Sequence, residues 1–477
     1  MSLSYENQLD HWVNKEKIGV NLLNSVGKLM YDKGIELILF RNNLLEIGVS
    51  ELMNYFSYAR NVVGRECNVE ITNILVSEML RLNLSASKID IGLLCAEYIE
   101  SGDKNANNFL RNKLSHIIDT DTSQRKAKDV ILYGFGRIGR LVARELIKQA
   151  GKGQQLRLKA IVVRNLTDIQ IIKRADLFRN DSVHGKFKGV VDVNLDTSSI
   201  IINGQVIKFI DGGRPENIDY IHHGIENALL IDNTGAFTDK ESLSRHLKSK
   251  GVSKVLLTAP GKEIPNIVYG INSRDLDIEN TNIFSAASCT TNCIAPILQI
   301  VENKYGIEKG HLETVHSYTN DQNLLDNMHE KPRRGRSAAI NMVITSTGAG
   351  KAVTKVITSL EGKLSANAVR VPTPNVSLAI LNLRLKSDTS IQDINFLIRE
   401  ASLKGNLVNQ INYQVDPDLV STDIIGDTCC SVYDSNATIA SGKDVVLYTW
   451  YDNEFGYTKQ VIRLAKLIAK VRRLTYY

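Results

Sequence analysis

The 477-residue sequence has no proline before Pro215 and no uninterrupted apolar run long enough to span a bilayer. It has only six cysteines, without the paired spacing of a zinc site or the density of a small secreted scaffold. With no signal peptide at the start, the expected location is the reducing cytoplasm. The formal charge of +6 is small for this length and spread along the chain, so nucleic acid is not indicated. These absences favour a globular protein acting on small, anionic molecules, with no membrane and no metal.

The length predicts roughly three domains at about 150 residues each. Residues 1–127 show helical periodicity rather than strand alternation, and we expect an all-helical N-terminal extension. Its apolar faces are Leu22, Val26, Leu29 and Met30, then Ile71, Ile74, Leu75 and Met79. A polar stretch follows, with a short helix expected near Phe109 to Ile118. No motif occurs there, so these helices are interpreted as packing on each other or on a partner subunit, with a regulatory module as the alternative.

A glycine-rich turn follows the first clear strand. Val130 to Tyr133 is a short apolar run that leads directly into GFGRIG, and a helical pattern follows. Glycines in this pattern permit a tight turn, close approach of a pyrophosphate and tight packing of helix against strand. Further strand-like runs, Leu158 to Val163, Ala228 to Ile231 and Lys254 to Leu257, extend a parallel sheet. We therefore expect a Rossmann dinucleotide-binding domain over residues 128–288.

The segment SAASCTTNCIAP places Cys289 among small hydroxyl residues at an expected helix start. Backbone N–H groups at a helix N-terminus stabilise a thiolate and bind anions, so the pKa of Cys289 is expected to fall toward working pH. Ser288, Thr290 and Thr291 are placed to line an anion site beside it. Cys293, one turn later, is interpreted as a buried structural residue. The segment predicts a nucleophile and a phosphate pocket on one turn.

Longer strand-like runs follow Cys293. They predict an α+β catalytic domain over residues 289–453 with a mainly antiparallel sheet, from Glu313 to Tyr318, Ala368 to Val371, Val376 to Leu383 and Asp444 to Tyr451. The last stretch is amphipathic, and a helix over residues 454–477 is expected to complete the dinucleotide-binding domain. The fold class is therefore α/β, preceded by the helical extension.

Seven segments in order, GFGRIGR, DSVHGKFKG, SAASCTTNCIAP, TVHSYTNDQ, RRGRSAAINMVITSTGAGKAV, VRVPTPNVS and WYDNEFGY, resemble the phosphorylating glyceraldehyde-3-phosphate dehydrogenase family. The resemblance covers roughly Asp129 to Arg473, and the extension is similar to that of the family's long bacterial form. It implies oxidation of glyceraldehyde 3-phosphate to 1,3-bisphosphoglycerate in glycolysis or gluconeogenesis, with inorganic phosphate and NAD or NADP. It also implies a homotetramer.

The resemblance implies that Cys289 attacks the aldehyde and that His316 is the base. It places the substrate phosphate near Thr319, Asp321, Arg334 and Arg370, with Asp321 orienting an arginine. It places inorganic phosphate near Ser288, Thr290, Thr347 and Gly348. Arginine suits both sites because its fixed fork of donors binds two phosphate oxygens at once. Arg333 and Arg336 are left as surface or subunit-contact residues.

On the cofactor side, the resemblance implies that Asn453 binds the nicotinamide carboxamide and that Tyr457 packs near the ring. The remaining cofactor residues are Gly134, Phe135, Gly136, Arg137, Ile138, Gly139, Thr234, Gly235 and Thr258. The sequence departs from NAD-specific members at the end of the second strand, where Arg164 and Asn165 replace an acidic residue, and at Asn327-Met328 in place of Leu-Pro. A cation there accommodates a 2′-phosphate, so dual or NADP-leaning use is expected.

Two other functions remain open. Erythrose-4-phosphate dehydrogenase uses a similar thiol and histidine but hydrolyses its intermediate, and the intact STGA run with Thr290 favours phosphate over water as the attacking group. The extension could instead make this chain mainly a regulatory or interaction protein with secondary dehydrogenase activity. The complete set of expected site residues argues against that second alternative.

Overall fold

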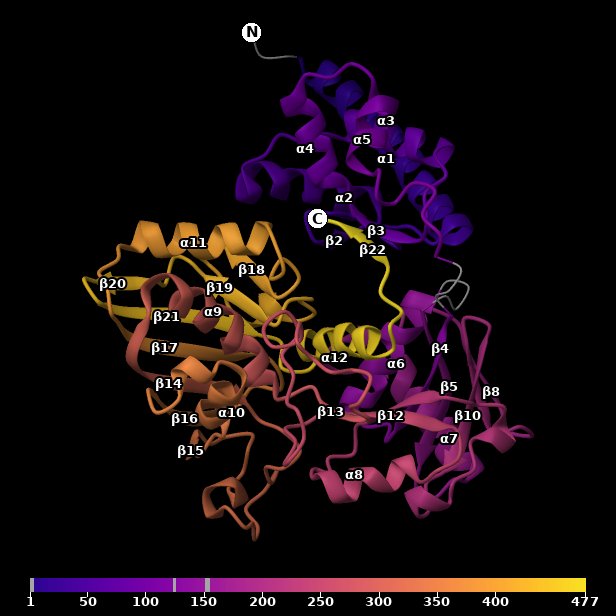
Figure 1. Ribbon diagram of the computed structural model, residues 1–477, viewed down its shortest axis with the longest axis vertical. Coiled ribbons are helices and arrows are strands. Elements are labelled where there is room, and N and C mark those ends of the chain that lie inside the picture. The colour runs from indigo at the N-terminus through magenta and orange to yellow at the C-terminus, as the bar shows by residue number, and fades with distance from the viewer. Residues whose placement is uncertain (1–3, 123–125, 151–154) are drawn as a thin grey trace. The chain divides into compact units, whose positions relative to one another are not determined.

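The computed structural model describes residues 4–122, 126–150 and 155–477, which form two compact units (Figure 1). The first unit comprises Met1–Lys126, Leu403–Gly405 and Val471–Tyr477, and the second comprises Ala127–Ser402 and Asn406–Lys470. Among the described residues, no helix combines the length and apolar character needed to cross a membrane.

The first unit contains five α-helices in its described part: α1 (Tyr5–Lys33), α2 (Val49–Tyr58), α3 (Val69–Arg81), α4 (Ile91–Ser101) and α5 (Ala106–Lys113). The expectation of an all-helical segment is incomplete, because a four-stranded sheet also occurs. Its order is β2-β1-β3-β22, from β2 (Asn42–Asn43), β1 (Glu36–Leu39), β3 (Ser87–Asp90) and β22 (Leu474–Tyr476). These strands are too short for alternation to reveal them in the sequence.

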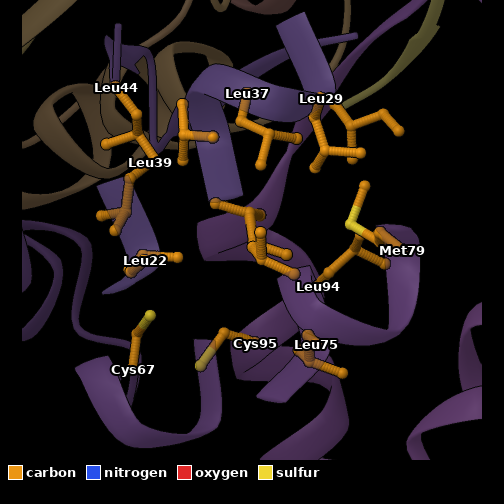
Figure 2. Packing of buried hydrophobic residues seen from close by; sticks show 14 of the residues in the cluster. Leu22, Leu29, Leu37, Leu39, Leu44, Cys67, Leu75, Met79, Leu94 and Cys95 are labelled. Atoms are coloured by element: carbon orange, nitrogen blue, oxygen red, sulfur yellow. The ribbon is translucent and has the colours of Figure 1, made fainter. Parts of the chain in front are cut away.

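A leucine-rich core holds this unit together (Figure 2). Leu22 and Leu29 from α1, Leu37 from β1 and Leu75 from α3 are each at most 1% exposed. Fully burying a leucine side chain contributes about 1.5–3 kcal/mol, so this one cluster supplies the main stabilisation of the unit. Cys67 and Cys95 lie in the same cluster as free, buried thiols.

The chain's C-terminus belongs to the first unit. Strand β22 runs parallel to β3, with Leu474 beside Ser87, and the Tyr476 hydroxyl donates to Glu97 at 2.5 Å. The expected helix over residues 454–477 is therefore too long. Helix α12 spans Phe455–Ile468, and the residues after Lys470 join the first unit instead of completing the dinucleotide-binding domain.

The second unit begins with a doubly wound sheet of order β13-β12-β11-β4-β5-β10-β9-β8. Its six neighbouring strands from β13 to β10 are parallel, which confirms the expected Rossmann pattern, while β9 and β8 are antiparallel. The strands are β4 (Lys128–Tyr133), β5 (Leu156–Val163), β8 (Val191–Asn194), β9 (Ser199–Ile202), β10 (Gln205–Asp211), β11 (Ala228–Asp232), β12 (Val252–Leu257) and β13 (Ile283–Ser285). The helices among them are α6 (Arg137–Ala150), α7 (Asp168–Arg179) and α8 (Lys240–Leu247).

A second large sheet has the order β15-β16-β14-β17-β21-β19-β18, with β20 beside β21. It is mainly antiparallel, as expected, although β14 runs parallel to β16 and β18 runs parallel to β19. Its strands are β14 (Ile307–Ser317), β15 (Val343–Thr345), β16 (Leu364–Val371), β17 (Ser377–Leu385), β18 (Ile411–Gln414), β19 (Ser431–Asp434), β20 (Ile439–Ser441) and β21 (Asp444–Tyr451). The accompanying helices are α9 (Cys289–Tyr305), α10 (Ala349–Val356) and α11 (Ile391–Leu403).

Candidate functional site

Cys289 is the first residue of helix α9, directly after the end of β13. Ser288 is the N-cap, and its hydroxyl oxygen accepts from the backbone N–H of Thr291 at 3.0 Å. Ala287 has φ of 55°, a left-handed conformation that is strained for a residue with a side chain. The strained turn and the capped helix together fix the cysteine at the N-terminus, where unpaired backbone N–H groups collect.

His316 lies opposite Cys289, near the end of β14. Its Nε2 atom is 3.7 Å from the Cys289 Sγ atom. Its Nδ1 atom is 2.7 Å from the carbonyl oxygen of Ser317, which can only accept, so Nδ1 carries the hydrogen. The Arg370 guanidinium is also near Nδ1, but at 3.3 Å, and its NH1 group bonds the same carbonyl at 3.0 Å. In this tautomer, Nε2 is free to accept the thiol proton.

Burial dominates the protonation of this pair. Burial, with the charge of Arg370 adding to it, lowers the pKa of His316 to about 4. Burial also raises the pKa of the Cys289 thiol, against the opposing effects of Arg370 and Thr290. The expectation of a lowered cysteine pKa is therefore wrong for the ligand-free site, because loss of hydration outweighs the helix N-terminus. The resting pair is a neutral thiol beside a neutral imidazole.

Arg370 is the cation nearest to this pair. In the parallel register of β14 and β16 it lies beside His316, and its charge acts on the Cys289 thiol. Its NH1 group donates to the Thr319 hydroxyl at 2.9 Å. Its Nε atom is buried and has no hydrogen-bond partner in the described structure. A buried donor without a partner costs about 1–3 kcal/mol.

The other residues expected near the substrate phosphate surround Arg370. Asp321 accepts from the Thr319 hydroxyl and forms an ion pair with Arg334. The Arg334 Nε group also donates to the Thr345 hydroxyl at 3.1 Å. Asp321 therefore orients an arginine, as the sequence led us to expect, and two guanidinium groups share one small polar cluster.

Of the residues expected near inorganic phosphate, two lie at the start of α10 and two lie at the start of α9. Gly348 is the N-cap of α10, and the Thr347 hydroxyl accepts from the Ala349 backbone N–H at 3.2 Å. The hydroxyls of Ser288 and Thr290 both have protein partners: Ser288 contacts Thr291 at 2.7 Å, and Thr290 contacts Tyr451 at 2.9 Å. To bind an anion, the Thr290 hydroxyl would have to release Tyr451.

The glycine turn between β4 and α6 has the form that a dinucleotide requires. Gly134 has φ of 92°, and a Cβ atom on Gly139 would lie 2.5 Å from the Gly134 carbonyl oxygen. A Cβ atom on Gly136 would meet no atom within 4 Å, so this glycine faces open space. Phe135 is buried beneath the turn, and Ile138 is half-buried in the first turn of the helix. These residues fit a pyrophosphate at the N-terminus of α6.

Thr234, Gly235 and Thr258 follow the carboxyl ends of β11 and β12, on the same edge of the sheet. Asp232 organises them: its carboxylate accepts from the Thr234 backbone N–H at 2.8 Å, and its carbonyl accepts from the Thr258 hydroxyl at 3.0 Å. The carboxylate also contacts His246 at 2.9 Å in a fully buried pair. Sequence reasoning missed Asp232, although its place at a strand end was a usable signal.

Arg164 and Asn165 follow the end of β5, and both are exposed. Asn165 has φ of 57°, and the Arg164 carbonyl accepts from Arg174 at 3.2 Å. The backbone is therefore turned and held at the strand end. The Arg164 side chain lies at the surface, where a second cation, Arg174, is close by.

Asn453 and Tyr457 are both buried, and each bonds a residue next to or near His316 or Cys289 in the chain. The Asn453 amide oxygen accepts from the Ser317 hydroxyl at 2.9 Å and from the Ser377 hydroxyl at 3.1 Å. With its oxygen held twice, the amide offers a ligand its NH₂ group. The Tyr457 hydroxyl donates at 2.9 Å to the carbonyl oxygen of Ala287, the strained residue before the nucleophile.

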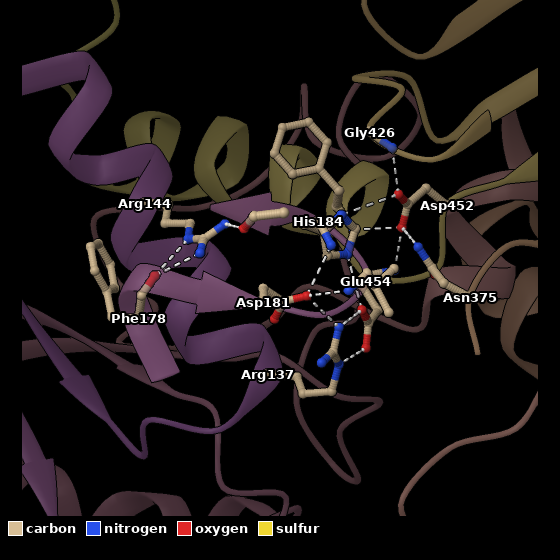
Figure 3. A network of polar contacts seen from close by, with 12 residues as sticks. Arg137, Arg144, Phe178, Asp181, His184, Asn375, Gly426, Asp452 and Glu454 are labelled. Atoms are coloured by element: carbon tan, nitrogen blue, oxygen red, sulfur yellow. Dashed lines mark hydrogen bonds and ion pairs between the residues drawn. The ribbon is translucent and has the colours of Figure 1, made fainter. Parts of the chain in front are cut away.

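A charged network includes Glu454, the residue that directly follows Asn453 in the chain (Figure 3). The side chain of Arg137, which is expected at the cofactor, forms ion pairs with Glu454 and with Asp181, the latter at 3.2 Å. His184 contacts Glu454 at 3.0 Å. Burial opposes ionisation, but the backbone N–H groups of His184 and Val183, with Arg137, lower the pKa of Asp181 to about 2. The network ties the glycine turn to the segment that carries Asn453.

Sequence reasoning also missed Tyr451. Its hydroxyl lies between the hydroxyls of Thr290 and Thr314, at 2.9 and 2.8 Å, and its ring meets the His316 ring edge-on at 6.0 Å. It therefore packs the histidine against the helix that carries the nucleophile. Within the described residues, no group of three potential metal ligands is assembled.

Two family profiles match this chain. Residues 128–240 match the NAD binding domain of glyceraldehyde 3-phosphate dehydrogenase, and residues 288–453 match its C-terminal domain. A glyceraldehyde-3-phosphate dehydrogenase-like protein of Pseudomonas aeruginosa is 45% identical over 451 residues, covering 94% of this chain and 98% of that protein. Glyceraldehyde-3-phosphate dehydrogenase 2 of a Nostoc species is 43% identical over 72% of this chain and 98% of its own length. Glyceraldehyde-3-phosphate dehydrogenase 1 of Bacillus subtilis is 39% identical over 72% and 99%.

Proposed function

Because the chain belongs to the glyceraldehyde-3-phosphate dehydrogenase family, we propose that it oxidises glyceraldehyde 3-phosphate with inorganic phosphate and a nicotinamide cofactor, giving 1,3-bisphosphoglycerate. One observation carries the proposal. The Cys289 thiol lies 3.7 Å from a histidine nitrogen that is free to accept its proton, and the Arg370 guanidinium is close enough for its charge to act on both groups. A nucleophile, a base and a donor for an anion therefore meet at one point.

In the first step, the thiol proton passes to His316 Nε2 as sulfur bonds to the aldehyde carbon. The resulting oxyanion takes that proton back, which gives a thiohemiacetal on Cys289 and a neutral imidazole. His316 then removes the hydroxyl proton as hydride leaves the carbon, and a thioester remains on Cys289. A phosphate oxygen attacks the thioester, the carbon–sulfur bond breaks, the sulfur takes the proton held by His316, and the acyl phosphate leaves.

The environment of His316 supports this sequence. Because its pKa is about 4, the imidazole is neutral at working pH and ready to act as base at each proton transfer. The Ser317 carbonyl fixes the tautomer, and Tyr451 fixes the ring. Arg370 supplies positive charge where the oxyanion and the attacking phosphate carry negative charge.

The cofactor, when bound, accepts the hydride. We propose that the turn from Gly134 to Gly139 holds its pyrophosphate and that Thr234, Gly235 and Thr258 line its path along the sheet edge. The Asn453 NH₂ group would then bind the carboxamide of the nicotinamide, with Tyr457 beside the ring. Arg137 supports this site indirectly, through Glu454.

We further propose dual or NADP-leaning specificity. The exposed Arg164 side chain at the end of β5, with Arg174 nearby, offers positive charge where an acidic residue would repel a 2′-phosphate. Replacing Arg164 by Asp should lower the NADP to NAD ratio of kcat/KM by about tenfold or more. An unchanged ratio in both Arg164→Asp and Asn165→Asp would remove this assignment.

A homotetramer in the cytoplasm is the assembly and location that we propose. Exposed apolar side chains between β14 and β15 support subunit contacts, since they are poorly placed for a monomer: Leu324, Leu325, Met328, Ile340 and Met342 are 71–91% exposed. Sedimentation at several concentrations would test the subunit number.

The activity is tested by steady-state oxidation of glyceraldehyde 3-phosphate with NAD or NADP, in the presence and absence of inorganic phosphate. The expected result is turnover that depends on phosphate. Equal turnover without phosphate would contradict the proposal and indicate hydrolysis, as in erythrose-4-phosphate dehydrogenase. Erythrose 4-phosphate as the alternative substrate completes the comparison.

A further inference from the structure

Helix α1 packs on its unit through its second half only. Leu22, Val26 and Leu29 are at most 1% exposed and belong to the leucine-rich core. The first α1 residue that contacts this core is Ile18. Among the described residues, those from Tyr5 to Lys17 lie outside the core, so more than three helical turns contribute nothing to it.

This first half nevertheless carries an apolar stripe. Tyr5, Leu9, Trp12, Val13 and Val20 are 74%, 43%, 46%, 36% and 57% exposed. They are spaced by four, three, one and seven residues, which places them along one side of a helix. Glu16 also lies on that side, and the Trp12 Nε1 group donates to it at 2.9 Å. A contiguous exposed stripe of this kind marks an interaction surface.

Charges flank the stripe along one edge. Glu6, Asp10 and Lys17 share that edge with Val13 and Val20, because these residues follow one another at alternating spacings of four and three. All three charged residues are exposed. Glu6 and Asp10 lie toward the start of the stripe, and Lys17 lies toward its end. Two copies of this edge that run in opposite directions therefore bring opposite charges together.

We propose that the stripe binds the same stripe of a second copy of this chain, as an antiparallel helix pair. A two-fold axis between Trp12 and Val13 brings Lys17 of one copy level with the gap between Glu6 and Asp10 of the other, on the same side of the pair. Tyr5 then lies level with Val20. A parallel pair would instead set acidic end beside acidic end, so charge selects the antiparallel arrangement.

A cysteine cross-link tests this pairing in the full-length chain. Val13 lies beside the proposed axis, so Val13→Cys brings two thiols together. The background is Cys289→Ser, which removes the one partly exposed cysteine among the described residues. Mild oxidation with diamide should give a disulfide-linked two-chain species. The matched control is Ile74→Cys, on α3 of the same unit and 52% exposed, which should give little of it.

Charge variants then test the direction of the pair. Lys17→Glu should lower the cross-linked fraction about fivefold at low salt, since each dimer loses two surface ion pairs. Adding Glu6→Lys and Asp10→Lys should restore it. Cross-linking no greater than in Ile74→Cys, or a charge reversal that is not rescued, would overturn the proposal. So would a Val13→Cys thiol protected from alkylation without any two-chain product, because the stripe would then be covered by its own chain.

Discussion

The second unit buries many polar side chains, several of them around Cys289, whereas the core of the first unit is almost entirely apolar. Around Cys289, the side chains of His316, Thr290 and Asn453 are all less than 10% exposed. In the first unit, the core between α1 and α4 is built from leucine, isoleucine, valine and methionine, with Asp90 the one buried carboxylate among its described residues.

This contrast distinguishes polar side chains that are placed for a reaction from apolar side chains that only stabilise the fold. Buried polar groups cost free energy unless they are paired, and around Cys289 most of them are paired while Arg370 Nε is left without a partner. The backbone N–H of Phe40 satisfies Asp90 at 3.0 Å and so stabilises a turn. The proposed reaction therefore depends on the second unit, and the proposed helix pairing depends on the first.

The largest expected effect comes from the two cysteines of α9. Cys289→Ser should lower kcat by about 10⁴-fold or more, because a serine hydroxyl is a far weaker nucleophile beside a neutral imidazole. Cys293→Ala is the matched control: Cys293 is fully buried one turn away, and its loss should cost about 1 kcal/mol of stability and leave kcat within about twofold. Steady-state rates and thermal unfolding measure both. Comparable losses of kcat would contradict the assigned nucleophile.

Replacing the base should have the next largest effect. His316→Asn should lower kcat by about 10²- to 10⁴-fold. In the native enzyme, the pKa of His316 near 4 means that kcat/KM should be flat from about pH 5 to neutrality and fall at lower pH, as protonation removes the acceptor for the thiol proton. The rate at which an alkylating reagent modifies Cys289 can be measured as a function of pH without substrate. This measurement checks the protonation of the pair independently of turnover. If kcat/KM instead fell with an apparent pKa near 6.5, burial would not determine the pKa of His316.

A smaller effect is expected from the network around Asn453. Glu454→Gln removes the charge that pairs with Arg137 and His184, so the asparagine should lose its fixed position and KM for the cofactor should rise about tenfold. Asp326→Asn breaks an exposed ion pair with Arg336 and should change KM by less than about twofold. A tenfold rise of KM in Asp326→Asn, or an unchanged KM in Glu454→Gln, would contradict the positioning role of Glu454.

The smallest effect should come from deleting the two terminal segments of the first unit, residues 1–126 and 471–477. A variant of residues 127–470 removes both ends of the chain, because β22 belongs to the sheet of the first unit. Its kcat should stay within about twofold of the full chain. A variant of residues 127–477 keeps Leu474 and Tyr476 without their neighbouring strand and should be less soluble. A tenfold loss of kcat in the shorter variant would show that the first unit takes part in the reaction and would favour the regulatory alternative.

Local patterns predicted much of the second unit. The glycine turn and the strand leading into it follow from neighbouring residues, and so does the helix start at Cys289. The contact of Thr290 with Tyr451 joins residues from distant elements, as does the pairing of Arg137 with Glu454, so neither could be predicted from local pattern. The raised pKa of Cys289 depends on packing as well, because burial is a property of the assembled fold.

The first unit was less predictable for the same reason. Its helices follow from apolar periodicity, and most of the expected core side chains of α1 and α3 are buried, but Ile74, predicted on the same face of α3, is 52% exposed because it points away from the core. Its sheet pairs β3 with a three-residue strand at the other end of the chain, and no local signal reports such a pairing. Short strands that pair with distant parts of the chain leave no periodic pattern in the sequence, so such a sheet cannot be predicted from it.

The most direct test of the proposed chemistry is a single turnover without inorganic phosphate, followed by mass analysis of the peptide that contains Cys289. Mixing the enzyme with glyceraldehyde 3-phosphate and oxidised cofactor should give a reduced cofactor and a phosphoglyceryl thioester on Cys289, and later addition of phosphate should release it as 1,3-bisphosphoglycerate. Cofactor reduction with unmodified Cys289, or with the acyl group on another residue, would contradict the account.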